Sequence, residues 1–490
     1  MADLKALRLP TPDTVPQEEL ASLVCRTAAD YISVLLRNTP ATLPEGANDV
    51  TMLCTHLRPH LDEYMAMLLF RSLLSEDKHV LPIEETVINH ATNDAALRER
   101  WAKAAVFGMG GVQNGGAHPL LLFDEHVQEG KCHHAYSSVA LVVQQLFGNA
   151  RLPKALYQLI REIDLIDAYG GAHPKHISNY ILRIHDCTEN KCLAHTIESK
   201  QAIVEACIVA LLRAAECEIP YWQDDFWQER VLSSFSMHIK TSSLRHMAGF
   251  EQATAQILNN LRSFRQPRFS TLSKDTRSHR LFQTLMVPFV VPLLPLVFGE
   301  AITPLVTLLW DSRIMTQINY AIVLQNLEEH VGPDPEDTDI TTTIGHITFR
   351  KVHTNFGNAA VTPWILEIQP KNGITNVRQA VISFVRKYNN DNALTLLRNT
   401  ETNTLVLSRS AGISLEQWKA LVDWLVAKEG SSDTEGQPGC WHVVSNAQGI
   451  PADFILNGNA AHRYVPPTQI TADALVEWLS KHPDASAPCR

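Results

Sequence analysis

The stretch Cys54-Thr-His56-Leu-Arg-Pro-His60-Leu-Asp62-Glu63 joins a short apolar run to a helical segment. The apolar run, residues 50–55, predicts a buried strand, and residues 62–74 predict the helix that follows it. Short buried strands that alternate with helices are typical of α/β proteins. This stretch therefore predicts that the chain begins with an α/β sheet.

The same alternation continues over the next hundred residues. Residues 104–107 and 120–123 are short apolar runs that predict strands, and residues 137–147 and 155–168 predict helices. Fully apolar strands are buried on both faces, which is typical of parallel sheets. Residues 1–195 are therefore predicted to form an α/β domain with a mostly parallel sheet.

The remainder of the chain does not continue this alternation of short strands and helices. Residues 196–331 are mainly helical in pattern, and the acidic, proline-containing segment GPDPEDTD at 332–339 predicts a linker. Residues 393–397 and 404–408 flank the polar turn RNTETN and predict a hairpin. A smaller α+β domain is therefore predicted at 340–490.

Composition excludes several classes of protein. The chain has 490 residues, of which 45% are hydrophobic and 19% charged, which excludes a disordered, collagen-like or coiled-coil chain. Its net charge of −10 argues against a general nucleic-acid coat protein. Nine cysteines are too sparse for a disulfide framework and suit a reducing compartment.

No segment reads as a signal peptide or a membrane span. The most apolar stretch, residues 285–310, contains four prolines and Glu300, so its charge-free part is shorter than the roughly 20 residues that a bilayer requires. Buried core is the better interpretation of this stretch. We therefore expect a soluble, cytoplasmic protein with no membrane partner.

Three side chains that are able to bind a metal lie within seven positions at the end of the first predicted strand and just after it: His56, His60 and Asp62. Ligands of open α/β sheets gather at the carboxyl ends of the strands, where a short loop can direct all three groups to one point. Imidazole together with carboxylate suits manganese, iron or zinc better than calcium. The alternative is a polar loop whose histidines cap the helix or bind backbone carbonyls.

Two further groups are candidate ligands. Glu125 and His126 end another apolar run and could supply ligands or hold an imidazole ligand in place, although such pairs also occur by chance on any surface. Asp164 and Asp167 are three residues apart on a predicted helix and therefore share a face. By itself, that face reads as a solvated helix surface.

The order of these motifs resembles the DHH phosphoesterase superfamily, most closely its melanocyte-proliferating-gene nuclease branch. The resemblance covers about residues 50–170 and rests on five short segments in a shared order. They are THLRPHLDE, FGMGG, DEH, YSSVALV and EIDLID. The resemblance implies a DHH-like fold, a helical insertion, a smaller substrate-binding domain and a divalent-metal centre, most simply one that holds manganese.

The resemblance also implies a ligand set and marks two departures from it. The implied ligands are His56, His60, Asp62, Glu125, His126 and Asp164, with Asp164 preferred over Asp167. Gly108 stands where the family has a metal-bridging Asp, and Glu125 stands where it has a His. A carboxylate can replace an imidazole, but a glycine cannot replace a carboxylate, so the two-metal centre is expected to be partial, rearranged or lost. The segment Cys132-His133-His134 is a lesser candidate for a displaced signature.

Substrate contacts are implied at two places. Arg58 lies inside the first motif, where it could orient a phosphate, and His126 is the second catalytic candidate. In the C-terminal domain Gly458 permits close backbone approach, and His462 and Arg463 could bind phosphate. A surface arginine and a plain strand-to-loop turn are the respective alternatives.

Two functions are consistent with the sequence. The first is a metal-dependent phosphodiesterase or exonuclease that acts on nucleotides or short single-stranded nucleic acid. The second is a catalytically degenerate relative that binds a nucleotide or a partner protein without hydrolysis, which the glycine at position 108 favours. The helical region and the C-terminal domain would also suit a homo-oligomer.

Overall fold

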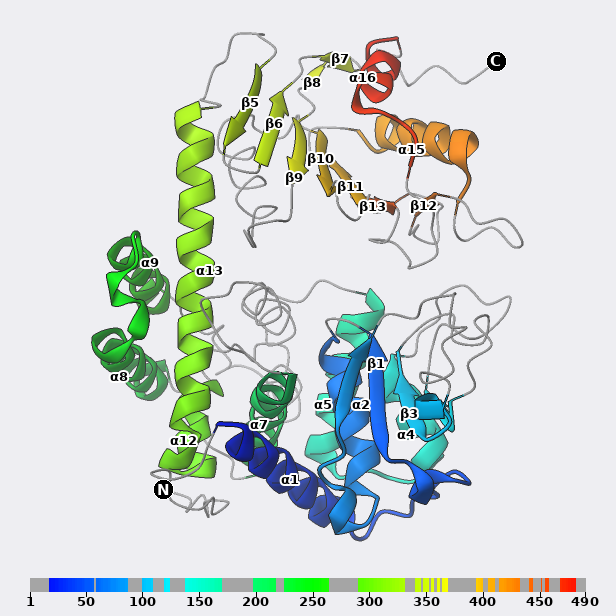
Figure 1. Cartoon of the computed structure of the whole chain (residues 1–490), viewed down its shortest axis with the longest axis vertical. Coiled ribbons are helices and arrows are strands. Elements are labelled where there is room, and N and C mark those ends of the chain that lie inside the picture. Colours follow the sequence, from blue (N-terminus) through cyan, green and yellow to red (C-terminus); the bar gives the residue numbers. More distant parts are fainter. Residues whose placement is uncertain are drawn as a thin grey trace. The chain divides into compact units, whose positions relative to one another are not determined.

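The structure is a computed structural model that divides the chain into two compact units, Met1–Gln317 and Ile318–Arg490 (Figure 1). It describes residues 17–56, 59–86, 99–108, 119–123, 137–169, 197–216, 224–263, 290–330, 340–344, 347–351, 354–356, 359–361, 364–368, 394–399, 404–409, 414–431, 440–443, 451, 454–457 and 468–481. The boundary between the units falls inside helix α13 (Thr303–His330). The linker predicted at 332–339 lies outside the described residues, and the division at 195 and 331 stays a prediction.

The first unit contains a four-stranded sheet in which every pairing is parallel. Its strands are β1 (Met52–His56), β2 (Ile83–Thr86), β3 (Ala104–Phe107) and β4 (Leu121–Phe123), in the order β2-β1-β3-β4. The predicted α/β character and parallel sheet are confirmed. Strand β2 was missed because its sequence, IEET, has the polar character of an edge strand rather than of a buried one.

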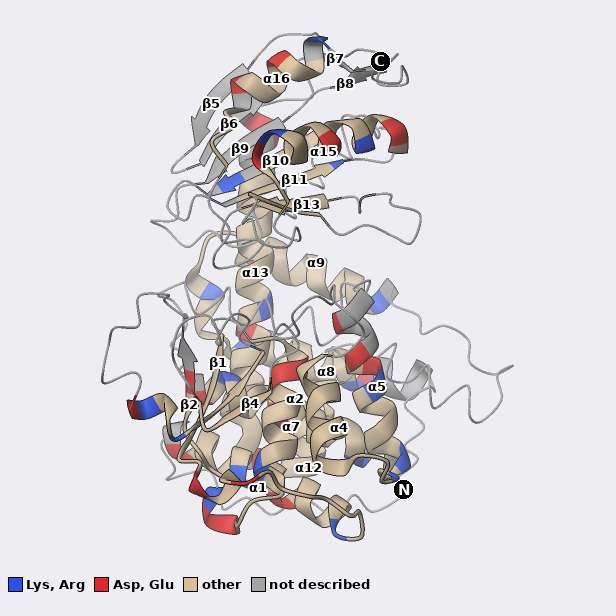
Figure 2. Cartoon of the chain, turned by 90° about the vertical axis from the view of Figure 1, so that its right-hand side faces the viewer, with Lys and Arg blue, Asp and Glu red and all other residues tan. Residues whose placement is uncertain are grey.

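Three helices of the first unit pack against one another. They are α2 (Leu61–Ser72), α4 (Ser138–Phe147) and α5 (Lys154–Tyr169). Two of them, α2 and α4, also contact strands of this sheet (Figure 2). The ring of Phe70 on α2 lies 5.9 Å from that of Phe107 and 5.5 Å from that of Phe123, and the last two rings stack at 5.0 Å. These buried contacts hold the ends of β3 and β4 against α2.

A buried ion pair joins α2 to a more distant helix. Arg71 of α2 donates from Nη2 to both carboxylate oxygens of Glu205 on α7 (Ile197–Glu216), at 2.6 Å each. Gln201 Nε2 also donates to Glu205 Oε1 at 2.8 Å, and both charged side chains are fully buried. Helix α1 (Gln17–Leu36) packs on both α2 and α7. The ion pair between Arg71 and Glu205 therefore links α2 to α7.

The other elements that the structure describes in the first unit are helices. They include α8 (Asp224–Thr241), α9 (Phe250–Ser263), α12 (Leu293–Phe298) and most of α13. His238 Nε2 and Ser242 Oγ donate to the buried carboxylate of Asp311, at 2.8 and 2.7 Å, which links α8 to α13. Residues 290–310 contribute many core side chains. Among the described helices, none has both the length and the apolar composition of a membrane span.

The second unit is built on a mixed seven-stranded sheet in the order β12-β13-β11-β10-β9-β6-β5. The strands are β5 (Ile340–Ile344), β6 (Ile347–Lys351), β9 (Trp364–Ile368), β10 (Leu394–Asn399), β11 (Thr404–Arg409), β12 (Trp441–His442) and β13 (Phe454–Asn457). A separate pair is formed by β7 (Thr354–Phe356) and β8 (Ala359–Val361). Strands β10 and β11 pair antiparallel, which confirms the predicted hairpin.

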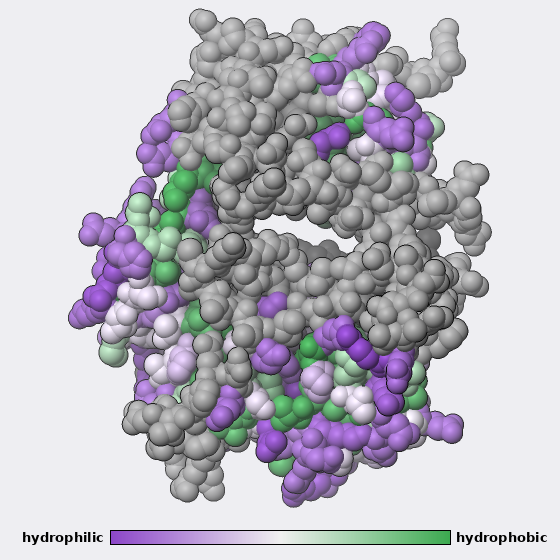
Figure 3. Space-filling view, in the orientation of Figure 1, coloured by the Kyte–Doolittle hydropathy of each residue, from purple (hydrophilic) through white to green (hydrophobic). Residues whose placement is uncertain are grey.

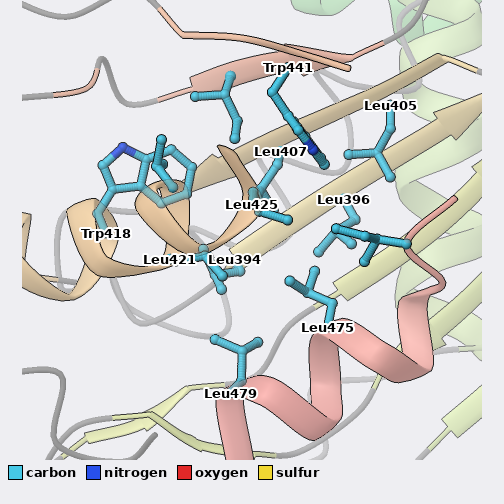
Figure 4. Close-up of a cluster of buried hydrophobic side chains, with 13 residues drawn as sticks. Leu394, Leu396, Leu405, Leu407, Trp418, Leu421, Leu425, Trp441, Leu475 and Leu479 are labelled. Atoms are coloured by element: carbon cyan, nitrogen blue, oxygen red, sulfur yellow. The ribbon is translucent and has the colours of Figure 1, made fainter. Parts of the chain in front are cut away.

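Helices α15 (Leu415–Glu429) and α16 (Ala472–Lys481) supply the core of this second unit (Figure 4). Their side chains meet alternate residues of β10 and β11, because successive strand residues point to opposite faces. The carboxylate of Glu429 accepts hydrogen bonds from Trp441 Nε1 at 2.9 Å and Thr468 Oγ1 at 2.6 Å. The carboxylate of Glu429 therefore links the end of α15 to β12 and to the segment that contains Thr468.

Large exposed apolar side chains are scattered over separate elements of the described chain. They are Val34, Tyr157, Met237, Ile322, Leu415 and Phe454. Figure 3 shows hydrophilic residues over much of the described surface of the first unit in that view. Isolated apolar side chains of this kind are ordinary on protein surfaces.

Candidate metal centre

The first candidate ligands lie where β1 ends and α2 begins. His56 is the last residue of β1, and His60 is the N-cap of α2 in an extended conformation. Asp62 and Glu63 follow in the first helical turn. The strand end and the helix N-terminus are therefore close together, since only residues 57–60 separate them. Carboxylates at a helix N-terminus also interact favourably with the helix dipole.

Glu63 contacts both histidines. Its Oε1 lies 3.0 Å from His56 Nε2, and its Oε2 accepts a hydrogen bond from the backbone N–H of His60 at 2.6 Å. The rings of His56 and His60 meet edge to face with centroids 5.3 Å apart. The side chain of Glu63 is 4% exposed and that of His56 is 18% exposed, so this part of the site is largely shielded from solvent.

Glu63 remains ionised despite its burial. Burial raises the pKa of its carboxyl group, but the charge of His56, the hydrogen bond to His56 and the charge of His60 together lower that pKa well below its usual range. A cation bound here would replace the imidazole protons, because an imidazole must be neutral to act as a ligand, and the ionised carboxylate would then pair with the cation instead.

Asp62 and Asp164 both bind the N-terminus of α4. The backbone N–H of Ser138 donates to Asp62 Oδ2 at 3.2 Å. The backbone N–H and the hydroxyl of Ser137 donate to Asp164 Oδ1 at 3.0 and 2.8 Å, while Ser137 Oγ accepts from the N–H of Ala140. This serine pair, which the sequence placed at a helix start, therefore orients two carboxylates from two different helices.

Asp167, one helical turn beyond Asp164, faces His60. Its Oδ1 lies 4.0 Å from His60 Nδ1. The site contains two groups of three side chains, and within each group the potential ligand atoms all lie within 4.8 Å of one another. The first group is His56, His60 and Glu63, and the second is His60, Asp62 and Asp167. His60 belongs to both groups, so they form one continuous cluster.

The donor set of this cluster fits a divalent transition metal. It offers two imidazoles and three carboxylates, which is the chemistry of manganese, iron and zinc sites. Two donors bound to one cation at about 2.1 Å lie about 3.0 Å apart when adjacent and about 4.2 Å apart when opposite. His56 and Glu63 are hydrogen-bonded directly at 3.0 Å and His60 lies 4.0 Å from Asp167, so the members of each pair are near enough to bind the same cation.

The structure brings together His56, His60 and Asp62, three of the ligands predicted from the sequence. Asp164 lies near them but binds Ser137, and Asp167 is the residue of that helix in the cluster. The other predicted site residues lie outside the described residues: Arg58, Glu125, His126, Gly458, His462 and Arg463, and with them the segment 132–134. Their roles stay predictions.

Sequence reasoning missed Glu63 as a site residue. The signal was present, because Glu63 stands three positions after the helix N-cap His60, which is the spacing of a capping box. That spacing predicts the hydrogen bond from the His60 backbone to Glu63, which the structure contains. The contact with His56 depends on how the strand meets the helix, which local spacing does not define.

Cys54, two residues before His56, is expected to be chemically inert in the native protein. Burial, followed by the charge of Glu84, raises the pKa of its thiol to about 12, and burial alone raises that of Cys207 to about 12. Both thiols therefore stay protonated and unreactive near pH 8. Peptide-resolved alkylation with iodoacetamide should label partly exposed Cys440 before Cys54 and Cys207, which should react only in denaturant. Equal labelling rates for Cys54 and Cys440 in the native protein would contradict the buried position of β1.

Comparison of the chain with models of protein families, with curated proteins and with solved structures returned no match.

Proposed function

We propose that this protein is a metal-dependent phosphodiesterase that hydrolyses nucleotides or short single-stranded nucleic acid. The observation that supports the proposal is the cluster of His56, His60, Asp62, Glu63 and Asp167 at the carboxyl end of the parallel strand β1. This is the end at which open α/β sheets bind their ligands. The order of the motifs along residues 50–170, with its resemblance to DHH phosphoesterases, supports the choice of a phosphodiester as the substrate.

The residues of the cluster have distinct tasks in this proposal. A bound divalent cation, manganese in the first instance, would supply an activated water and neutralise charge on the phosphoryl oxygens. His56 and Glu63 form the buried side of the centre, whereas His60 has a half-exposed side chain and faces the side open to substrate. Ser138 holds Asp62 through its backbone N–H and so limits the orientation of that carboxylate.

The finer assignments belong to the same proposal. Arg58 would orient the phosphate, Glu125 and His126 would complete the centre, and Gly458, His462 and Arg463 would bind the substrate from the C-terminal unit. They rest on the motif order and on the chemistry of these side chains. Asp164 is proposed to act through Ser137, because its carboxylate accepts hydrogen bonds from the hydroxyl and the backbone N–H of that serine.

The alternative is binding of a nucleotide or partner without hydrolysis, and Gly108, directly after β3, is the observation that favours it. One experiment separates the two functions. Purified protein is analysed for manganese, iron and zinc, then assayed in added Mn²⁺ with a generic phosphodiester and with short oligonucleotides. Chelator-treated protein, before and after Mn²⁺ is restored, is the control.

We expect bound metal and turnover that the chelator removes and Mn²⁺ restores. Metal without turnover of any substrate would favour the non-hydrolytic alternative. Protein that contains no metal, binds no Mn²⁺ and hydrolyses no phosphodiester would reject both the enzyme and the metal centre.

A further inference from the structure

Gly108 directly follows the neighbouring strand β3, level with the first candidate ligand, His56. The last register pair of β1 and β3 is Thr55 with Phe107, so Gly108 follows Phe107 as His56 follows Thr55. Its backbone N–H donates to the carbonyl of Phe123 at 3.0 Å, and its φ angle is +56°. Most L-residues avoid this left-handed conformation, but glycine adopts it freely.

The space beside Gly108 is already filled by Glu63. A Cβ atom at position 108 would lie 2.7 Å from Glu63 Oε1, 2.8 Å from Glu63 Cγ and 2.8 Å from Ser138 Oγ. Non-bonded carbon atoms do not approach other heavy atoms this closely, so a side chain here would have to displace Glu63. Displacement would break the contacts of Glu63 with His56 Nε2 and with the backbone N–H of His60.

We propose that Glu63 is a metal ligand whose carboxylate, reaching from helix α2, takes the space that a side chain at position 108 would fill. This inference rests on the proposed metal centre and deepens it. Glu63 Oε1 is hydrogen-bonded to His56 Nε2 at 3.0 Å, belongs with His56 and His60 to a group of side chains that could hold one cation, and occupies the place of a side chain at position 108. Gly108 is then a requirement of this centre, because its missing side chain leaves room for the carboxylate of Glu63.

The proposal makes Gly108 and Glu63 a coupled pair, which a double-mutant cycle can measure. The proteins are wild type, Glu63→Ala, Gly108→Asp and the double variant, and the readout is the Kd for Mn²⁺ in the absence of substrate. Aspartate is chosen because it tolerates positive φ better than most residues. Glu63→Gln is added because it preserves shape and can still accept from the backbone N–H of His60. Glu84→Gln, on the adjacent strand β2 and paired with Arg100, is the matched control.

We expect Glu63→Gln, Glu63→Ala and Gly108→Asp each to weaken Mn²⁺ binding by more than about tenfold, while Glu84→Gln leaves the Kd unchanged. The double variant should bind Mn²⁺ more tightly than either Glu63→Ala or Gly108→Asp, because the introduced aspartate then enters the space that Glu63 vacates. Circular dichroism of the metal-free proteins checks that each variant is folded.

The outcomes separate this inference from the proposed function. Wild type that binds Mn²⁺ together with a Glu63→Gln variant of equal affinity would overturn the role of Glu63 and leave the metal centre standing. A double variant that binds Mn²⁺ no more tightly than the tighter-binding of Glu63→Ala and Gly108→Asp would overturn the exchange between positions 63 and 108. Wild type that binds no Mn²⁺ would instead reject the metal centre, and this inference with it. If Gly108→Asp does not fold, Glu63→Gln alone decides whether the carboxylate is a ligand.

Discussion

Asparagine in place of Asp62 is expected to remove most of the bound metal and to lower phosphodiester hydrolysis by more than about 100-fold. Substitution of groups that only orient a metal ligand already costs about 10–100-fold in affinity or activity, and loss of a ligand costs more. Asp62 is 1% exposed and belongs to the cluster with His60 and Asp167. Asparagine keeps its size and can still accept from the N–H of Ser138, so the change removes mainly the negative charge.

The measurement pairs metal content with initial rates in saturating Mn²⁺. Asp49→Asn is the matched control, because Asp49 lies in the same unit just before β1 and is exposed. It should retain full metal content and full activity. An Asp62→Asn protein with wild-type metal content and wild-type rate would remove Asp62 from the centre.

Glutamine in place of Glu205 is expected to lower the free energy of unfolding by about 3–5 kcal/mol, because it leaves the Arg71 guanidinium buried without its counter-charge. Burial lowers the pKa of Arg71, but the carboxylate of Glu205 outweighs it and raises that pKa above its usual value, so the arginine is charged in the folded protein. A loss of this size corresponds to a fall in Tm on the order of 10 °C.

Thermal unfolding and hydrogen exchange in α2 and α7 would measure this effect. Glu198→Gln, an exposed change on the same helix α7, should alter stability by less than about 1 kcal/mol. The double variant Arg71→Met with Glu205→Leu should be far more stable than Glu205→Gln, since apolar side chains of similar volume can replace a buried pair. A Glu205→Gln protein as stable as wild type would show that the pair does not hold α2 against α7.

The sequence predicted most of the local elements of the first unit. Residues 104–107 form β3 with the predicted bounds, and residues 137–147 and 155–168 correspond closely to α4 and α5. These predictions succeeded because an uninterrupted apolar run and a helical period are local properties. Strands β5 to β9 were not predicted one by one, since their sequences alternate less clearly and their pairing is set by other strands.

The candidate site was predictable only in part. His56, His60 and Asp62 follow a buried strand so closely that the chain has little freedom to separate them. Whether Asp164 or Asp167 would face His60 was not decided by their spacing. Residues three apart share a helix face, but the rotation of α5 about its axis depends on how it packs against α2 and α4.

By itself, the sequence determined the parallel α/β character of the first unit and the strand end at which histidines and carboxylates gather. Tertiary structure alone decided that Glu63 fills the space beside Gly108, and that Arg71 meets Glu205, 134 residues away. The physical reason is that hydrophobic period and capping act within a few residues, whereas contacts between elements depend on packing that minimises voids and pairs every buried charge.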